Sequence, residues 1–161
     1  MQLAVSALEN EAPKQIPATG KRSLFMAIAV LAMAGIVVSA ISLERHYAKS
    51  ASNFCDFGER FNCDIVNRSE YSRVMGIPVA AIGILGYGVL LALATIYRAR
   101  VETPLRLLVA AVAGFAFALY LTYIEGYVLE TWCILCLSSL GLIAGITLLA
   151  GAVKAREGTD S

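Results

Sequence analysis

The chain has 161 residues, of which 58% are hydrophobic and 16% are charged. Soluble globular domains average roughly 45–50% apolar and about 25% charged residues, so this composition argues against a soluble single domain. Thirteen basic and twelve acidic side chains give a net charge of +1. Such a balance provides no long-range electrostatic field, and we therefore expect no nucleic-acid partner.

Residues 1–22 contain Pro13, Pro17 and Gly20 among scattered charges, and this composition predicts a mobile cytoplasmic tail. Four stretches without charge follow, and each is long enough to cross a bilayer core as a helix, which takes about 20 apolar residues. The first stretch is too long, and starts too far from the N-terminus, to be a cleaved signal peptide. The sequence therefore predicts an all-α membrane protein, a four-transmembrane-helix bundle with helices over residues 23–43, 74–97, 107–124 and 131–153.

Basic residues in the short flanks of these helices set the expected orientation. Most of them lie on one side of the bundle: Lys14, Lys21, Arg22, Arg98, Arg100, Arg106, Lys154 and Arg156. Positively charged flanks stay in the cytoplasm and the number of spans is even, so we expect both termini in the cytoplasm. The long polar loop between the first two helices, residues 44–73, then lies on the extracytoplasmic face.

All four cysteines are expected on that face. Cys55 and Cys63 lie in the long loop, and Cys133 and Cys136 lie in the first turns of the last helix. An extracytoplasmic compartment is oxidising, so paired cysteines there indicate disulfide chemistry. The loop pair lies in a polar segment with no strong helix pattern, and we expect it to move and to exchange disulfides with the fixed helical pair.

The segment Cys133-Ile134-Leu135-Cys136 is a C-x-x-C motif at a helix N-terminus. A spacing of three places both sulfurs on one helix face. We expect Thr131 to cap this helix, and the open backbone N–H groups of its first turn to favour thiolates. Two other interpretations compete. One is a structural disulfide in the loop beside an incidental C-x-x-C; the other is a four-cysteine zinc site, which the C-x7-C spacing of the loop pair disfavours.

The order and spacing of the cysteines, a serine after the loop pair, and several glycines and tyrosines together resemble one known family. The positions that carry the resemblance are Cys55, Cys63, Ser69, Gly76-Ile77-Pro78, Gly83, Tyr87, Tyr120-Leu121-Thr122-Tyr123, Glu125, Cys133, Cys136 and Ser138-Ser139. The pattern is similar to the vitamin K epoxide reductase family in its stand-alone bacterial form. By this resemblance, residues 23–153 form the catalytic domain and residues 154–161 a cytoplasmic tail.

The resemblance implies a four-helix bundle around a membrane quinone of the ubiquinone or menaquinone (vitamin K) type. It implies that Cys133 and Cys136 reduce the quinone, and that Cys63 passes electrons inward through a transient disulfide with Cys133. Cys55 would exchange with a separate thioredoxin-like (DsbA-like) carrier in the periplasm, because the chain has no fused thioredoxin-like domain. The quinone-binding residues expected are Cys136, Ser69, Tyr87 and Tyr123.

The predicted function is thus that of a thiol-disulfide oxidoreductase in the bacterial inner membrane, which drives disulfide formation in exported proteins. One alternative is a quinone or quinone-epoxide reductase proper. A second is a non-enzymatic four-span scaffold with structural disulfides. A third, the unrelated DsbB-type oxidase, is disfavoured because its C-x-x-C lies in the first outer loop and not in the last helix.

Three further groups of side chains have a structural and a functional interpretation. Tyr123, with Tyr120 and Tyr127, belongs either to an aromatic belt at the membrane interface or to the quinone site. Glu125 and Glu130 bracket the outer end of the third helix, where we expect them to reach interfacial water; a proton relay at Glu125 is the alternative. His46, the only histidine, is expected to be exposed to solvent just past the first helix.

Overall fold

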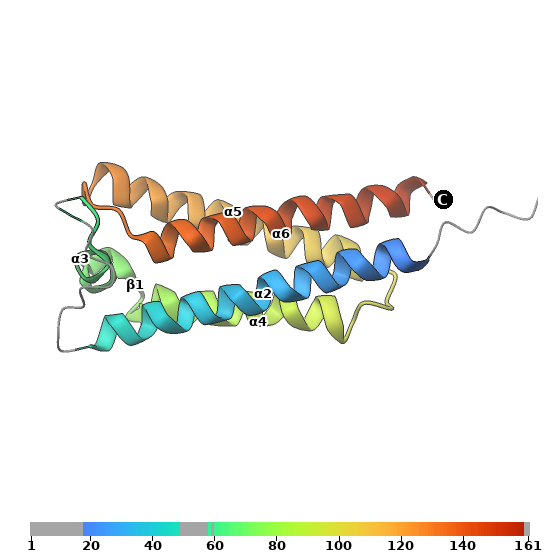
Figure 1. Cartoon of the computed structure of the whole chain (residues 1–161), viewed down its shortest axis with the longest axis horizontal. Coiled ribbons are helices and arrows are strands. Elements are labelled where there is room, and N and C mark those ends of the chain that lie inside the picture. The colour runs from blue at the N-terminus through green and yellow to red at the C-terminus, as the bar shows by residue number, and fades with distance from the viewer. Residues whose placement is uncertain (1–17, 49–57, 59, 160–161) are drawn as a thin grey trace, which may run out of the picture.

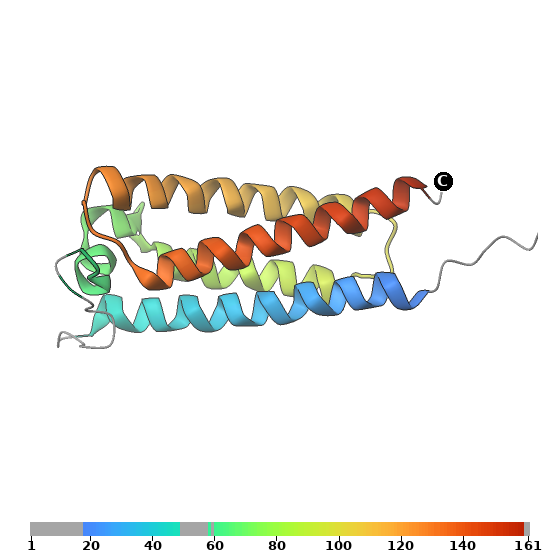
Figure 2. The same cartoon turned by 45° about the horizontal axis from the view of Figure 1, so that its top comes forward.

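The computed structural model describes residues 18–48, 58 and 60–159, and over these residues the protein is mostly helical. Four long helices lie side by side: α2 (Ala18–Tyr47), α4 (Val79–Thr95), α5 (Thr103–Tyr127) and α6 (Ile134–Thr159) (Figure 1). The start of α2 and the end of α6 lie at one end of the bundle, and the short helix α3 (Cys63–Arg68) lies at the other (Figure 2). Residues 18–22 of the predicted tail belong to α2, and residues 1–17 lie outside the described part of the chain.

Three of the helices, α2, α5 and α6, are long and apolar enough to cross a membrane. The fourth, α4, is also apolar but has 17 residues. Its length is about 26 Å, slightly less than the roughly 30 Å of a bilayer core. All four helices expose large apolar side chains, such as Val30, Leu85, Val109 and Leu148. The structure is therefore that of an all-α membrane protein with three helices able to span a bilayer and one shorter apolar helix, and the four-span topology stays a prediction.

The helix expected over residues 74–97 begins later, because its first residues form a hairpin. Strands β1 (Arg73–Val74) and β2 (Ile77–Pro78) pair antiparallel. Met75 (φ 53°) and Gly76 (φ 84°) form the turn between them, and positive φ at both positions is typical of the type I′ hairpin turn. A run without charge gives the length of a span but not where its helix starts. Gly76 in the turn and Pro78 at the end of β2 are the local signals that delay α4 to Val79.

The long polar loop contains a helix that the sequence did not predict. Helix α3 begins at Cys63 and is capped by Asn62, whose side-chain oxygen accepts hydrogen bonds from the N–H groups of Asp64 (3.0 Å) and Ile65 (3.1 Å). This is the usual role of asparagine at an N-cap. The 3-10 turn η1 (Glu70–Ser72) then leads into the hairpin. Cys63 is consequently held in regular structure, whereas Cys55 lies outside the described residues.

The helices pack around two apolar clusters. The larger cluster fills the bundle and includes Ile28 and Ala32 of α2, Tyr87 of α4, Leu107 of α5 and Ile146 of α6. The smaller cluster consists of Cys63, Val66, Cys133 and Leu135. It joins α3 to the start of α6, so two of the cysteines predicted to react are themselves part of the packed interior.

Candidate redox site

The structure brings three of the four cysteines into one cluster. Cys63 and Cys133 are 1% and 0% exposed, and Cys136 is partly buried. The Cys133 thiol is hydrogen bonded to both Cys63 and Cys136. None of the three is joined by a disulfide to another described cysteine. Cys133 is thus the central member of a row of sulfurs that leads from α3 into α6.

Backbone pairing holds Cys63 beside Cys133. Phe61 and Trp132 form an isolated parallel β-bridge. In it the Trp132 N–H donates to the Arg60 carbonyl (2.8 Å) and the Asn62 N–H donates to the Trp132 carbonyl (3.2 Å). The segment before α3 is therefore fastened to the segment before α6. This pairing joins parts of the chain that are far apart in sequence, and no local pattern predicts it.

Helix α6 starts later than expected, and Thr131 does not cap it. The Thr131 hydroxyl donates to the Leu129 carbonyl (3.1 Å). The helix begins at Ile134, and the Cys133 carbonyl accepts the N–H of Leu137 (3.0 Å), so Cys133 occupies the N-cap position. The Cys133 N–H donates to a side-chain oxygen of Glu125 (3.2 Å). A carboxyl group from α5 therefore accepts an N–H group at the start of α6, where the N–H groups were expected to stabilise a cysteine thiolate.

The expectation of a stabilised thiolate is wrong for Cys133. Its hydrogen bond with Cys136 raises the pKa of the Cys133 thiol, burial adds to this rise, and the contact with Cys63 acts in the opposite direction. A position at a helix N-terminus lowers the pKa of a thiol only when the sulfur lies close to the free N–H groups and to the positive end of the helix dipole. Here the nearest N–H is used by Glu125, and the sulfur lies in a buried cluster.

Glu125 does not reach interfacial water. Its side chain is 3% exposed, and it is hydrogen bonded to the Cys136 thiol as well as to the Cys133 N–H. Trp132 packs on the neighbouring Gly126, where an added Cβ would lie 3.0 Å from the indole ring. Glu130, in contrast, is exposed. The expectation for Glu130 therefore stays a prediction, whereas that for Glu125 is corrected, because the segment before α6 covers the last turns of α5.

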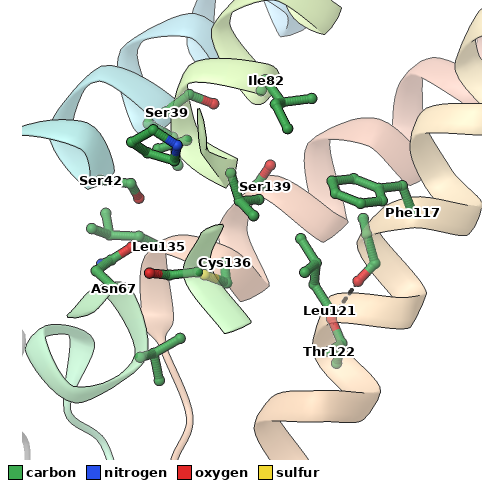
Figure 3. Close-up of a pocket in the computed structure, with 18 of the residues that line it drawn as sticks. Ser39, Ser42, Asn67, Ile82, Phe117, Leu121, Thr122, Leu135, Cys136 and Ser139 are labelled. Atoms are coloured by element: carbon green, nitrogen blue, oxygen red, sulfur yellow. Dashed lines mark hydrogen bonds between the residues drawn. The ribbon is translucent and has the colours of Figure 1, made fainter. Parts of the chain in front are cut away.

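A cavity of about 320 Å³ adjoins the cysteine cluster. Figure 3 shows side chains from several helices converging on it. Its apolar wall includes Ile82, Phe117, Leu121 and Leu135, and its polar groups include Ser39, Ser42, His46, Asn67, Ser69, Tyr87, Thr122, Glu125, Cys136 and Ser139. A mostly apolar cavity with a few polar groups is typical of a small-molecule site.

Three of the four predicted quinone-binding residues line this cavity, and the fourth does not. Cys136, Ser69 and Tyr87 are in its wall. The Tyr87 hydroxyl lies 2.9 Å from both the carbonyl and the hydroxyl of Ser139, while the Ser69 hydroxyl donates to the Val66 carbonyl (2.8 Å). Tyr123 is 58% exposed and stacks on Tyr127. Tyr123 does not line this cavity, so we do not retain it as a quinone-binding residue; the aromatic-belt interpretation stays a prediction.

Two residues of the cavity were missed or misplaced by the sequence analysis. His46 is not free in solvent: its Nδ1 is hydrogen bonded to the Asn67 carbonyl, and its Nε2 accepts the N–H of Arg73 Nε (3.3 Å). Asn67 is 7% exposed, and its side-chain nitrogen has no hydrogen-bond partner among the described residues. Asn67 lies one helical turn after Cys63, so it would have been noticed had α3 been predicted.

No group of three His, Cys, Asp or Glu residues within the described part of the chain could hold a metal ion. The described residues that could hold a ligand are those of the cavity. Its polar groups belong to α2, α3, α4, α5 and α6, and both Cys136 and Asn67 line it. The arrangement offers two-electron thiol chemistry next to a site for an apolar acceptor.

Comparison with protein families agrees with this geometry. Residues 26–150 match the model of the vitamin K epoxide reductase family. The matched range includes the cysteine cluster, Glu125 and the whole cavity. It covers well over half of the chain, and it spans the membrane helices on which those residues lie. The chain therefore belongs to the vitamin K epoxide reductase family of membrane thiol oxidoreductases.

Proposed function

We propose that this protein oxidises a separate thioredoxin-like carrier and passes the electrons through its cysteines to a membrane quinone. The proposal places the reaction on the extracytoplasmic face of a bacterial inner membrane, where it drives disulfide formation in exported proteins. One observation carries it: the sulfurs of Cys63, Cys133 and Cys136 form a contiguous row, and Cys136 lines an apolar cavity.

The row of sulfurs supports electron transfer by successive disulfide exchange. Starting from a Cys133–Cys136 disulfide, the Cys63 thiolate attacks the Cys133 sulfur and releases Cys136 as a thiolate. Cys55 then attacks Cys63, which leaves a Cys55–Cys63 disulfide and a reduced Cys133. The loop disulfide oxidises the dithiol of the carrier. Each exchange breaks one S–S bond and forms another, so two electrons move inward for every carrier that is oxidised.

The cavity suits a quinone by size and by the groups in its wall. Its volume of about 320 Å³ falls within the roughly 300–1,000 Å³ of ligand sites. The side-chain nitrogen of Asn67, which has no hydrogen-bond partner within the described residues, is a donor for a carbonyl oxygen, and the aromatic ring of Phe117 in the cavity wall suits a flat ring. A bound quinone supplies an acceptor for two electrons and two protons. The protein's part is to hold the ring beside Cys136 and to exclude water.

The proposal is tested with purified protein in detergent under anaerobic conditions. A water-soluble quinone analogue and a reduced thioredoxin-like carrier are added, and quinone absorbance is followed. We expect the wild type to reduce the quinone and Cys136→Ser to lose at least about two orders of magnitude in rate, because the Cys133–Cys136 disulfide beside the cavity cannot form. Ser138→Ala is the matched control, since Ser138 is exposed on the same helix and lies outside the cavity wall.

Cys136→Ser has a second readout in the same experiment. Its Cys133 thiol has only Cys63 left as a described neighbouring sulfur, so we expect a Cys63–Cys133 disulfide to accumulate on oxidation, detected by peptide mass spectrometry. No quinone reduction by the wild type with several carriers and quinones would refute the proposed function. Turnover of a quinone epoxide at a higher rate than of the quinone would instead favour an epoxide reductase.

A further inference from the structure

We propose that Glu125 is a catalytic proton acceptor for the Cys133–Cys136 pair, taking the thiol proton of Cys136 as the disulfide forms and passing it toward the cavity. The inference rests on the proposed function, since it concerns how the same two cysteines are oxidised. It assigns a chemical role to a carboxyl group that the disulfide exchanges themselves do not use.

The position of Glu125 is unusual for an acid in a membrane protein. It lies near the end of a helix able to span the membrane and is 3% exposed. A buried carboxylate is costly unless other groups compensate its charge, so acids within membrane helices mark functional sites by default. Over the described residues Glu125 forms no salt bridge, and its hydrogen-bond partners are the Cys136 thiol and the Cys133 N–H. Both partners belong to the C-x-x-C motif.

The chemistry of the cysteine pair requires a proton acceptor. Forming one disulfide from two thiols releases two protons, and the attacking sulfur must be a thiolate. The Cys133 thiol, whose pKa is raised by its hydrogen bond to Cys136 and by burial, does not ionise readily by itself. His46 also lines the cavity, but both of its ring nitrogens are hydrogen bonded, to Asn67 and Arg73. Glu125 is the carboxyl group, among the described residues, that is hydrogen bonded to the Cys136 thiol.

The proposed step balances in protons and electrons. The Cys136 S–H bond breaks and its proton moves to a Glu125 oxygen, which the existing hydrogen bond already joins to the thiol. The Cys133 S–H proton follows through the Cys133–Cys136 contact as the S–S bond forms. Two electrons and two protons leave the pair and are taken up by a quinone in the cavity, which Glu125 also lines. The carboxylate is then restored.

The test isolates this step from quinone and carrier. In a Cys55→Ala/Cys63→Ala background, the only disulfide that can form within the chain is Cys133–Cys136. The reduced, quinone-free protein is oxidised with diamide, which accepts two electrons and two protons, and the remaining thiols are trapped by alkylation and counted by mass spectrometry. Glu125→Gln keeps an oxygen for the Cys133 N–H but cannot take a proton. We expect disulfide formation to slow by about 10²-fold at neutral pH.

Two further variants separate a chemical from a structural role. Glu130→Gln is the matched control, because Glu130 is an exposed glutamate five residues away, and we expect no change. Glu125→Asp restores a carboxyl group and should recover a substantial part of the rate. Thermal unfolding in detergent shows whether Glu125→Gln is folded. If it is not, the rate of disulfide formation in Glu125→Asp, compared with that of the parent, still measures the effect of a carboxyl group that is one methylene shorter.

The pH profile supplies the signature that a structural role would not produce. Without a local base, hydroxide must remove the proton, so the rate of Glu125→Gln should rise with pH and approach the parent rate under alkaline conditions. The other titratable groups facing this site are Cys133, Cys136, Tyr87, Tyr71 and His46. They are identical in the two proteins compared, and Cys63 is replaced by alanine in both.

Equal rates for Glu125→Gln and its parent, or a loss of the same size at every pH, would overturn the role of Glu125. These outcomes do not depend on quinone reduction. A wild type that forms the disulfide with diamide but reduces no quinone would refute the proposed function and leave the proton acceptor standing. Normal quinone reduction by full-length Glu125→Gln would refute the acceptor and leave the proposed function standing.

Discussion

At the scale of single residues, Asn67 is a buried polar side chain with a hydrogen-bond donor that the described residues do not satisfy. It is buried in the cavity wall, yet its side-chain nitrogen has no partner among the described residues. Leaving a buried donor without a partner costs about 1–3 kcal/mol. A ligand with a carbonyl oxygen in the cavity would remove this cost, and a side chain kept in such a position therefore indicates ligand binding more than fold stability.

Replacing this amide separates the two roles. In Asn67→Leu, we expect the KM for the quinone analogue to rise by up to about tenfold, because a net hydrogen bond of about 0.5–1.5 kcal/mol is lost. The thermal midpoint in detergent should stay the same or increase, since an unpaired buried donor is removed. Steady-state titration with quinone and a melting curve measure both. An unchanged KM together with a lower midpoint would show that Asn67 is structural.

The chemistry of the site could be predicted from single residues only in part. The cysteines were identified from their spacing, and Ser69 and Tyr87 do line the cavity. The burial of Glu125, the pairing of His46 with Asn67 and the raised pKa of Cys133 all depend on segments that meet only in the folded chain. Local sequence patterns contain no information about which distant segment will cover a side chain.

At the scale of elements, Gly35 of α2 lies directly against the Tyr87 ring of α4. A Cβ atom there would lie 2.6 Å from Cγ of Tyr87 and closer still to two other ring atoms. Because Tyr87 spans from this contact to Ser139 on α6, its ring connects three helices. The absence of a side chain at Gly35 therefore sets both the spacing of α2 and α4 and the position of the Tyr87 hydroxyl in the cavity.

We expect Gly35→Ala to destabilise the protein by about 1–3 kcal/mol, as is usual for overpacking of a close contact. It should also weaken quinone binding, because Tyr87 must move. Gly88→Ala is the matched control: this position lies in α4 with no atom within 4 Å of an added Cβ, and it lies outside the cavity wall. The readouts are thermal unfolding in detergent and quinone titration. Equal behaviour of the two variants would contradict the role of the α2–α4 contact.

The sequence predicted the positions of the long helices better than the residues at which they begin. Long uncharged runs predicted where all four long helices lie, because burial in lipid requires them. Helix starts were less predictable. Residues 74–78 were predicted to belong to a span but form part of a hairpin. Thr131 was predicted to cap the last helix, but its hydroxyl donates to the Leu129 carbonyl. The helix ends depend on turn geometry and on partners from other segments, which hydropathy does not describe.

At the scale of the whole molecule, the reactive groups and the two ends of the described chain lie at opposite ends of the bundle. The start of α2 and the end of α6 are at one end, while α3 and the cysteine cluster are at the other (Figure 1). The connection between α4 and α5, which carries Arg98 and Arg100, is at the same end as the chain ends. With basic flanks in the cytoplasm, this geometry predicts that the cysteines face outward.

This orientation is checked by labelling intact cells with a membrane-impermeant maleimide. In a background without the four native cysteines, we expect Glu70→Cys to be labelled and Arg100→Cys to be labelled only after the membrane is opened. Both positions are exposed in the structure, one at each end of the bundle. If only Arg100→Cys were labelled in intact cells, the protein would have the opposite orientation to the one predicted.

The bridge between Phe61 and Trp132 favours the reaction of Cys63 with Cys133 over the reaction of either cysteine with a thiol from another molecule. With Cys63 fastened beside Cys133, each sulfur meets the other at an effective concentration of about millimolar or more. A free carrier at micromolar concentration cannot match that encounter rate, and the 0% exposure of Cys133 further limits its access. The inner pair is thereby insulated from bulk thiols, so under our proposal electrons enter only through the loop.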